Sequence, residues 1–402
     1  MTAAAHRPRL SALAGVIGLA IGLGGCISSG VSDLTGVVAS YSPFSSAPGE
    51  TKKISLLVAS THEKANLGQA TFSEIIATVP PGHSPGVIER PVVTMESPLR
   101  HVTLGKPRPL SGQGLQASVS RRLAGRQGMS RDVLVFVHGF NNSLEDAAYR
   151  LTQIVADTNF AGATILFAWP SRASMFSYVS DKDGATASRD ALEKLLRDLG
   201  ANPDVGRVHV LAHSMGSWLA MESLRQAAIG GDGSLGGKIG AVMLAAPDLD
   251  LDVFRGQIAR IGRGDNISLF VASDDRALMI SSRLAGLRAR VGALDLSNRE
   301  QRDEIASLGV RVYDLTGIGS SDYMRHGAFA EAPQIVQVIG ARLKEPKITE
   351  GVATASAATS GPTTPSLGPV AAPGTVSQEA LAPVTPIAAE TQQAPPASTT
   401  VQ

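Results

Sequence analysis

The amino-acid sequence predicts an α/β fold with a mostly parallel, doubly wound sheet covered by helices. Two observations favour this fold. Short apolar runs typical of buried strands alternate with helical patterns through the middle of the chain, as parallel strands joined by helical crossovers require. In addition, the strand-like run at 207–212 passes directly into a small-residue turn and then into a helical pattern at 215–229. The core of the fold is expected to span residues 131–344.

The other elements follow from the same patterns. Ser143, with Asp146 three residues later, is a capping-box pattern that begins a helix near 143–158, directly after an apolar strand at 133–138. Further strands are expected at 53–60, 163–168, 241–246, 267–272 and 310–315, and further helices near 186–199, 298–307 and 332–343. The Pro- and Gly-rich part at 80–109 is expected to form early strands and loops over one rim of the sheet.

The turn after the strand at 207–212 has the pattern small-X-Ser-X-Gly, with Ala212, Ser214 and Gly216 at the three defined positions. Small residues on both sides of the serine allow a tight strand-to-helix corner. Such a corner exposes the serine hydroxyl at the carboxyl end of a sheet, above the amino end of a helix. Glycine is usual at the first position, and alanine still fits. The pattern predicts a nucleophile elbow with Ser214 as the nucleophile.

A serine hydroxyl needs a base that takes its proton and an acid that orients the base. On a parallel-sheet scaffold these groups follow in the order serine, acid, histidine. Of the eight histidines only His326 lies after Ser214, on a loop beyond the strand expected at 310–315. A lone histidine is more often a surface residue, but this position and order favour His326 as the base.

Three aspartates remain open as the acid. Asp274 and Asp275 follow the strand expected at 267–272, and Asp248 follows the strand before it. Because the later strand should lie nearer the loop of His326, we favour Asp275 and keep Asp248 and Asp274 as alternatives. Either alternative could instead cap the helix that follows it.

Acyl transfer also needs two backbone donors for the developing oxyanion. The strand at 133–138 ends in a His-Gly turn, which on this scaffold aims one N–H at the nucleophile, here expected from Phe140. The second donor is expected to be the N–H of Met215, directly after Ser214. His138 is expected to hold the turn, and Trp169 either lines the same rim or packs in the core.

Several of these segments resemble a bacterial family of α/β-hydrolase-fold proteins whose cellular role was long unassigned. The matching segments are 136–141, 167–171, 211–216, 244–248 and 273–278. The resemblance covers roughly residues 52–343. It implies the α/β-hydrolase fold with Ser214, Asp275 and His326 as the triad. It implies no substrate, since this fold supports many acyl-transfer reactions.

The beginning of the chain is expected to be a signal peptide, residues 1–25. A basic start precedes a small or apolar stretch at 10–25, which is shorter than the roughly 20 residues that span a bilayer. The stretch ends at Cys26, the chain's one cysteine, in a Leu-Gly-Gly-Cys sequence that resembles the cleavage box of bacterial lipoproteins. We expect a lipid anchor at Cys26 and a place in the bacterial cell envelope, on the outer-membrane or periplasmic side rather than the inner membrane. An uncleaved anchor and a plain secretory signal are the alternatives.

The rest of the chain divides by composition. Residues 26–51 are expected to form a tether and residues 52–130 the N-terminal strands and rim of the domain. The segment 345–402 contains nine of the chain's 23 prolines and no aromatic residue. We therefore expect it to be a disordered tail that could contact the cell wall. The net charge of +1 gives no sign of a nucleic-acid partner. No cofactor or metal is expected, and the substrate should be a small-molecule or lipid acyl compound.

Two classes of function fit these observations. The first is a serine hydrolase that cleaves an ester, thioester or amide through an acyl-enzyme on Ser214, with acyl transfer to another acceptor as a variant. The second is a non-catalytic envelope lipoprotein that uses the fold as an interaction module. A complete triad in the correct order favours catalysis.

Overall fold

The computed structural model describes residues 49–62, 69–91, 95–172, 177–262 and 264–346. The predicted signal peptide, Cys26 and nearly all of the predicted tether and tail lie outside these residues. Within the described ranges, no helix is both long and apolar enough to cross a membrane. The described helices and strands run from Lys52 to Lys344.

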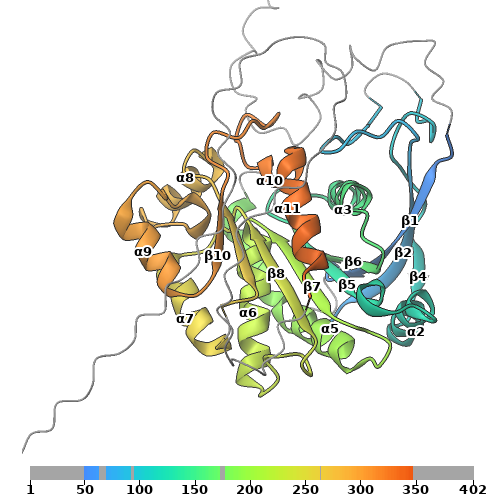
Figure 1. Ribbon diagram of the computed structural model, residues 1–402, viewed down its shortest axis with the longest axis horizontal. Helices are drawn as coiled ribbons and strands as arrows, with labels where there is room; N and C mark the ends of the chain where they lie inside the picture. Colours follow the sequence, from blue (N-terminus) through green and yellow to red (C-terminus); the bar gives the residue numbers. More distant parts are fainter. Residues whose placement is uncertain (1–48, 63–68, 92–94, 173–176, 263, 347–402) are drawn as a thin grey trace, which may run out of the picture.

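A ten-stranded sheet runs through the domain in the order β10-β9-β8-β7-β5-β6-β1-β2-β3, and β4 pairs with β2 (Figure 1). The parallel strands are β1 (Lys52–Ser60), β5 (Val133–Val137), β6 (Ala163–Ala168), β7 (Val208–His213), β8 (Ile239–Ala245), β9 (Ile267–Val271) and β10 (Arg311–Asp314). The antiparallel edge is β2 (Thr71–Val79), β3 (Thr103–Leu104) and β4 (Arg108–Leu110). The sheet is mostly parallel, as predicted.

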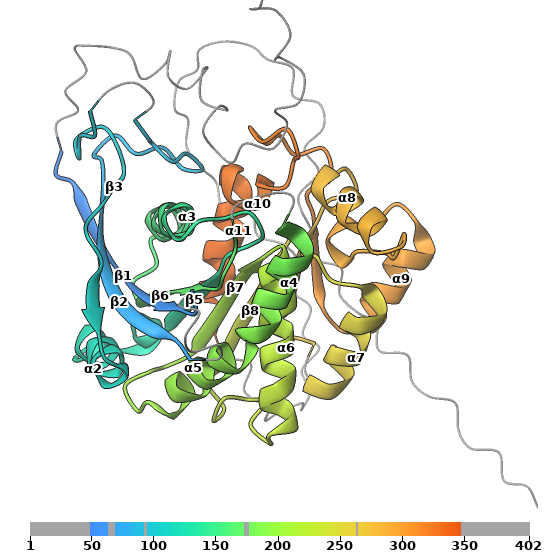
Figure 2. The same cartoon turned by 180° about the vertical axis from the view of Figure 1, so that it is seen from behind.

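Helices cover both faces of the sheet (Figures 1 and 2). One face carries α2 (Gly112–Leu123), α4 (Tyr178–Ala187), α5 (Arg189–Ala201), α6 (Met215–Ile229), α7 (Leu251–Ile261) and α9 (Arg299–Ser307). The other carries α3 (Leu144–Thr158), α10 (Ala328–Glu331) and α11 (Pro333–Lys344). Helix α8 (Arg276–Leu284) and the short turns η2 (Gly128–Arg131) and η4 (Val291–Ala293) complete the described elements. The architecture is a doubly wound three-layer domain.

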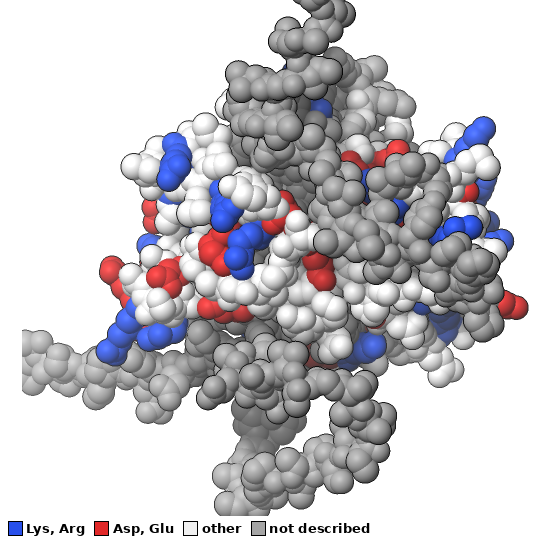
Figure 3. Space-filling view, turned by 90° about the horizontal axis from the view of Figure 1, so that it is seen from above, with Lys and Arg blue, Asp and Glu red and all other residues white. Residues whose placement is uncertain are grey.

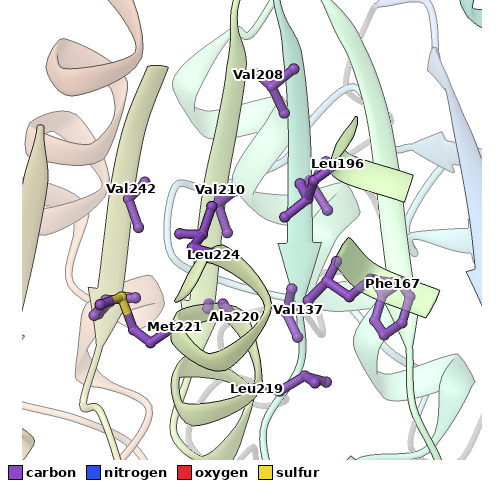
Figure 4. Packing of buried hydrophobic residues seen from close by; sticks show 14 of the residues in the cluster. Val137, Phe167, Leu196, Val208, Val210, Leu219, Ala220, Met221, Leu224 and Val242 are labelled. Atoms are coloured by element: carbon purple, nitrogen blue, oxygen red, sulfur yellow. The ribbon is translucent and has the colours of Figure 1, made fainter. Parts of the chain in front are cut away.

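The central strands are apolar on both sides because helices bury both faces. Neighbouring residues of β7 point to opposite faces, so Val210 belongs to one buried cluster and Leu211 to the other. Figure 4 shows the first cluster, where Val208 and Val210 lie in one core with Leu219 and Leu224 of α6. Buried side chains therefore pack against both faces of β7 and against α6, and this packing fixes the turn between them.

Several helices differ from the prediction. The helix expected near 186–199 is α5, and the helix before it, α4, was expected as a loop; the two helices meet at Ser188. There the Ser188 hydroxyl donates to the carbonyl of Gly184 and contacts the hydroxyl of Thr61. Helix α2 was not expected, and α7 and α8 were expected only as the segments that Asp248 or Asp274 could cap. They have only nine to twelve residues, and helices this short depend on tertiary packing more than on local propensity.

Candidate active site

Ser214 lies at a sharp corner between β7 and α6. Its backbone angles, φ 53° and ψ −125°, are rare for a residue with a side chain and store strain. Two hydrogen bonds hold it there. The Ser214 N–H donates to the carbonyl of Ala245 at 2.9 Å, and the Asp248 N–H donates to the Ser214 carbonyl at 3.2 Å. The structure therefore has a strand-to-helix elbow at the residue that the sequence indicates.

The small residues around the elbow have a steric purpose. A Cβ atom on Gly216 would lie 2.3 Å from the carbonyl oxygen of His138. A Cβ on Gly139 would lie 2.7 Å from Nδ1 of His213 and 2.9 Å from Cβ of Ser214. Since the turn after β5 presses directly on the elbow, both positions need glycine. Ala212 is completely buried, which shows that its methyl group fits where glycine is usual.

Asp275 and His326 form a short hydrogen bond, 2.6 Å between Oδ2 and Nδ1. Asp275 is 1% exposed and is also the N-cap of α8, because its other oxygen accepts the N–H of Leu278 at 3.0 Å. Burial lowers the pKa of His326, but the neighbouring carboxylates, Asp275 first among them, outweigh it and raise the pKa above its ordinary value. The structure thus brings together the two residues expected as acid and base.

The remaining ring nitrogen of His326, Nε2, forms no hydrogen bond with another described residue, and neither does the hydroxyl of Ser214. The ring of His326 lies 4.6 Å, centroid to centroid, from the ring of His213, the residue before the serine. The ring of His326 therefore packs against the residue before Ser214, and both Nε2 of His326 and the Ser214 hydroxyl are without a partner among the described residues. Catalytic hydrogen bonds often form fully only when substrate is bound.

His213 connects the elbow to the loop of the histidine. Its Nε2–H donates to the carbonyl oxygen of His326 at 3.1 Å, and its ring stacks on Phe329 at 4.6 Å. Burial, together with the nearby His326, holds the pKa of His213 well below its ordinary value. His213 is thus a neutral donor that fixes the backbone of His326. The sequence showed only that it precedes Ser214 and gave no sign of this contact.

The two predicted oxyanion donors lie on either side of Ser214. Phe140 follows β5 in the turn that touches the elbow, and Met215 is the first residue of α6. In the described part of the chain, neither N–H donates a hydrogen bond. The Phe140 ring packs edge-on against Tyr178, 5.5 Å between centroids. Two unpaired N–H groups at a turn and a helix start can bind an anionic oxygen.

His138 supports the turn that carries Phe140. It accepts the N–H of Trp169 at Nε2 and donates from Nδ1 to the carbonyl of Gly139, and its carbonyl accepts the indole N–H of Trp169 at 2.8 Å. Burial lowers the pKa of His138 to about 4, so it stays neutral. Trp169 is fully buried and stacks on His138 at 5.0 Å. Of the two interpretations of Trp169, core packing is the correct one.

The two alternative acids, Asp248 and Asp274, bind residues other than His326. Asp248 accepts the hydroxyls of Tyr178 at 2.8 Å and Ser281 at 2.5 Å and pairs with the buried Arg290 at 3.2 Å. Asp274 pairs with Arg325 at 3.0 Å and is one-third exposed. Neither caps a helix, since α7 and α8 begin at other aspartates. Sequence reasoning missed the buried cluster of Asp248, Tyr178, Ser281 and Arg290, whose members are far apart in the chain.

The described residues contain no group of three or more His, Cys, Asp or Glu side chains that could hold a metal ion. The arrangement at the carboxyl end of the sheet is instead a serine, an imidazole–carboxylate pair and two free backbone donors. These are the groups that acyl transfer through a serine requires.

Several solved structures are similar to this chain at low sequence identity. A predicted hydrolase from Thermoplasma acidophilum is 17% identical, over 54% of this chain and 87% of that one, with a TM-score of 0.34. A Rhizomucor miehei esterase is 13% identical, over 73% and 83% of the two chains, with a TM-score of 0.34. An esterase from Pyrobaculum calidifontis has the same identity and TM-score, over 73% and 84%. Comparison with curated proteins gave no match.

The family comparison covers more than half of the chain. Residues 113–342 match the family described as alpha/beta hydrolase of unknown function (DUF900). The matched region runs from α2 to α11 and so includes the elbow, Asp275 and His326. The topology of the sheet agrees with this match, because the elbow strand β7 lies at the centre of the parallel strands. The chain belongs to this family of alpha/beta hydrolases.

Proposed function

We propose that this protein is a serine hydrolase that cleaves an acyl ester, thioester or amide through an acyl-enzyme on Ser214. The observation that carries the proposal is the 2.6 Å bond between Asp275 and His326 beside a strained serine elbow. A buried carboxylate bonded to Nδ1 leaves Nε2 as the proton acceptor and stabilises the imidazolium that forms.

The reaction follows from these positions. Ser214 Oγ attacks the acyl carbonyl carbon while His326 Nε2 takes the hydroxyl proton. The N–H groups of Phe140 and Met215 stabilise the negative oxygen of the tetrahedral intermediate. His326 then returns the proton to the leaving alcohol, thiol or amine as its bond to the carbonyl breaks. Water attacks the acyl-enzyme by the same route and releases the acid and the free serine.

The electrostatics of the site support these roles. The raised pKa of His326 reflects carboxylates that favour its protonated form, which is the form created when the serine loses its proton. His213 adds no competing positive charge because its own pKa is held low by burial. The free N–H groups offer partial positive charge where the oxyanion develops.

Pre-steady-state hydrolysis of a p-nitrophenyl ester tests the proposal. Wild type should release nitrophenol in a burst equal to the enzyme concentration. The matched control Ser307→Ala, at an exposed serine of α9, should do the same. Ser214→Ala should give no burst and lose roughly 10⁴- to 10⁶-fold in rate, as removal of a triad nucleophile does. A burst that survives in folded Ser214→Ala would overturn the proposal.

We also propose that Cys26 carries the lipid anchor and places the enzyme in the cell envelope. The support is the sequence around Cys26, which lies outside the described residues. Replacing Cys26 by serine should prevent metabolic labelling with a fatty acid. Fatty-acid label that persists in the Cys26→Ser variant would speak against the anchor.

A further inference from the structure

Helix α8 exposes an apolar face. Its inner side is buried through Leu278 and Ser281. On the outer side, Met279 is 42% exposed and Ile280 39%, and the exposed fraction is 65% for Leu284. Ile280 and Leu284, four residues apart, lie on the same side of the helix, and Met279 lies beside them, four residues before the exposed Arg283. These three exposed side chains form the apolar stripe of α8. The stripe needs a partner, since large apolar side chains clustered on a surface mark an interaction site.

Positive charge accompanies this stripe. Residues 276–290 contain four arginines and no aspartate or glutamate. Arg283 lies on the outer face, and in the described ranges its guanidinium forms no ion pair or hydrogen bond with another residue. Arg276, two turns earlier, places its guanidinium over the exposed ring of Tyr323 at 4.5 Å and donates to the Tyr323 carbonyl at 3.4 Å. The other two arginines are engaged, Arg288 by Asp250 and Asp252 and Arg290 by Asp248.

The outer face of α8 flanks the candidate active site. The helix begins directly after Asp275, its N-cap and the hydrogen-bond partner of His326. Tyr323, under Arg276, lies three residues before His326. Figure 1 places α8 at the same end of the sheet as α10, and Figure 3 views the molecule from this end, where Lys and Arg side chains lie among uncharged surface and beside Asp and Glu side chains.

We propose that this face, formed by Arg276, Met279, Ile280, Arg283 and Leu284, docks the enzyme on a lipid surface with anionic headgroups. A helix with aliphatic side chains and arginines on one face, and no acidic residue, fits the boundary between headgroups and acyl chains. The aliphatic groups enter the acyl region while the free guanidinium of Arg283 meets lipid phosphates. Charge complementarity therefore selects an anionic lipid surface.

This docking deepens the proposed function and rests on it for the substrate class. An esterase held on a bilayer through the helix that follows its catalytic acid would receive its substrate from the bilayer. The substrate class is then an acyl ester of a membrane lipid. Docking itself requires no chemistry at Ser214, so the two proposals can fail separately.

A fluorescent probe on α8 tests the docking in the full-length chain. With Cys26→Ser as the background, Leu284→Cys and the control Ser307→Cys are each labelled with an environment-sensitive nitrobenzoxadiazole dye. Vesicles of phosphatidylcholine alone and of phosphatidylcholine with phosphatidylglycerol are then added. We expect a blue shift and a gain in intensity at position 284 only, with the anionic vesicles, and a weaker response at high salt.

Arg283→Gln should weaken the partition measured by this probe about fivefold, the loss expected for one arginine at an anionic surface. It should leave hydrolysis of a soluble ester unchanged.

The docking would be overturned if the emission of the probe at position 284 does not change when anionic vesicles are added. It would also be overturned if that change is no larger than the change at position 307. If soluble esters are still cleaved in that case, the proposed hydrolase stands. If the probe responds but no ester is cleaved, the docking stands and the hydrolase proposal fails.

Discussion

His213 donates its Nε2–H to the carbonyl oxygen of His326, so the residue next to the nucleophile holds the backbone of the base. This bond connects two segments that lie 113 residues apart. It couples the strained elbow to the long loop after β10, which Glu331 and Asp274 hold at other points. The orientation of the base therefore depends on a side chain outside the triad.

Replacing His213 separates this role from simple packing. His213→Phe keeps a ring on Phe329 but removes the donor, and we expect kcat to fall about tenfold with KM little changed, the loss of one positioning hydrogen bond. His213→Gln keeps an N–H donor and should retain more of kcat than the phenylalanine variant does. Steady-state kinetics checks this order, with thermal unfolding to show that both variants fold. A larger loss for glutamine than for phenylalanine would contradict the role.

The acid is tested by three single exchanges to asparagine. Asp275→Asn should lower kcat by about 10⁴-fold, because the amide favours the wrong tautomer of the base. Asp274→Asn is the matched control: it breaks a partly exposed ion pair with Arg325, its amide oxygen can still accept the Gly317 N–H, and it should change kcat less than about threefold. Asp248→Asn should mainly lower the unfolding temperature, because it disturbs the buried pair with Arg290. An Asp274 variant as slow as the Asp275 variant would disprove the assignment.

The pH dependence of kcat/KM follows from the pKa of His326. Only the neutral imidazole can accept the serine proton, so kcat/KM should fall as pH drops through that pKa. Because the pKa is raised, the midpoint of this limb should lie above 6.5 in the free enzyme. Asp275→Asn removes the main raising charge, so the midpoint of its residual activity should move to lower pH. A shift to higher pH in that variant would be inconsistent with the site.

A second histidine gives the fold a pH-dependent contribution to stability. His83 bonds Glu89 through Nδ1 and Asp157 through Nε2. Burial opposes its charge, but these carboxylates raise the pKa of His83 to about 9. A raised pKa in the folded state stabilises the fold below pH 6.5, and this stability is lost as pH rises towards about 9.

Urea unfolding at several pH values measures this contribution. Wild type should lose about 3 kcal/mol of unfolding free energy relative to His83→Gln across that window, from the size of the pKa shift. Two variants with the same pH slope would show that His83 is not the group responsible.

The central elements could be predicted because their causes are local. The corner at Ser214 follows from an apolar strand, small flanking residues and a helical pattern, all within about twenty residues of sequence. The order of serine and histidine left one base, His326. The choice of acid was harder, because Asp274 and Asp275 are adjacent and only the packing of α8 decides which one faces His326.

The features that the sequence did not reveal depend on contacts between distant segments. The bond from His213 to His326 and the cluster of Asp248 with Tyr178 and Ser281 join residues on different elements. Neither contact produces a pattern of residue spacing that can be recognised in a single sequence. The same holds for α8, whose exposed apolar face becomes visible only when its buried side is known.

Labelling with a fluorophosphonate probe, mapped by mass spectrometry, tests most directly whether Ser214 is an activated nucleophile. We predict one label per chain on Ser214 in folded wild type, none in Ser214→Ala, and labelling that slows as pH falls through the raised pKa of His326. Folded wild type that takes up no label, or takes it up equally in Ser214→Ala, would contradict the account.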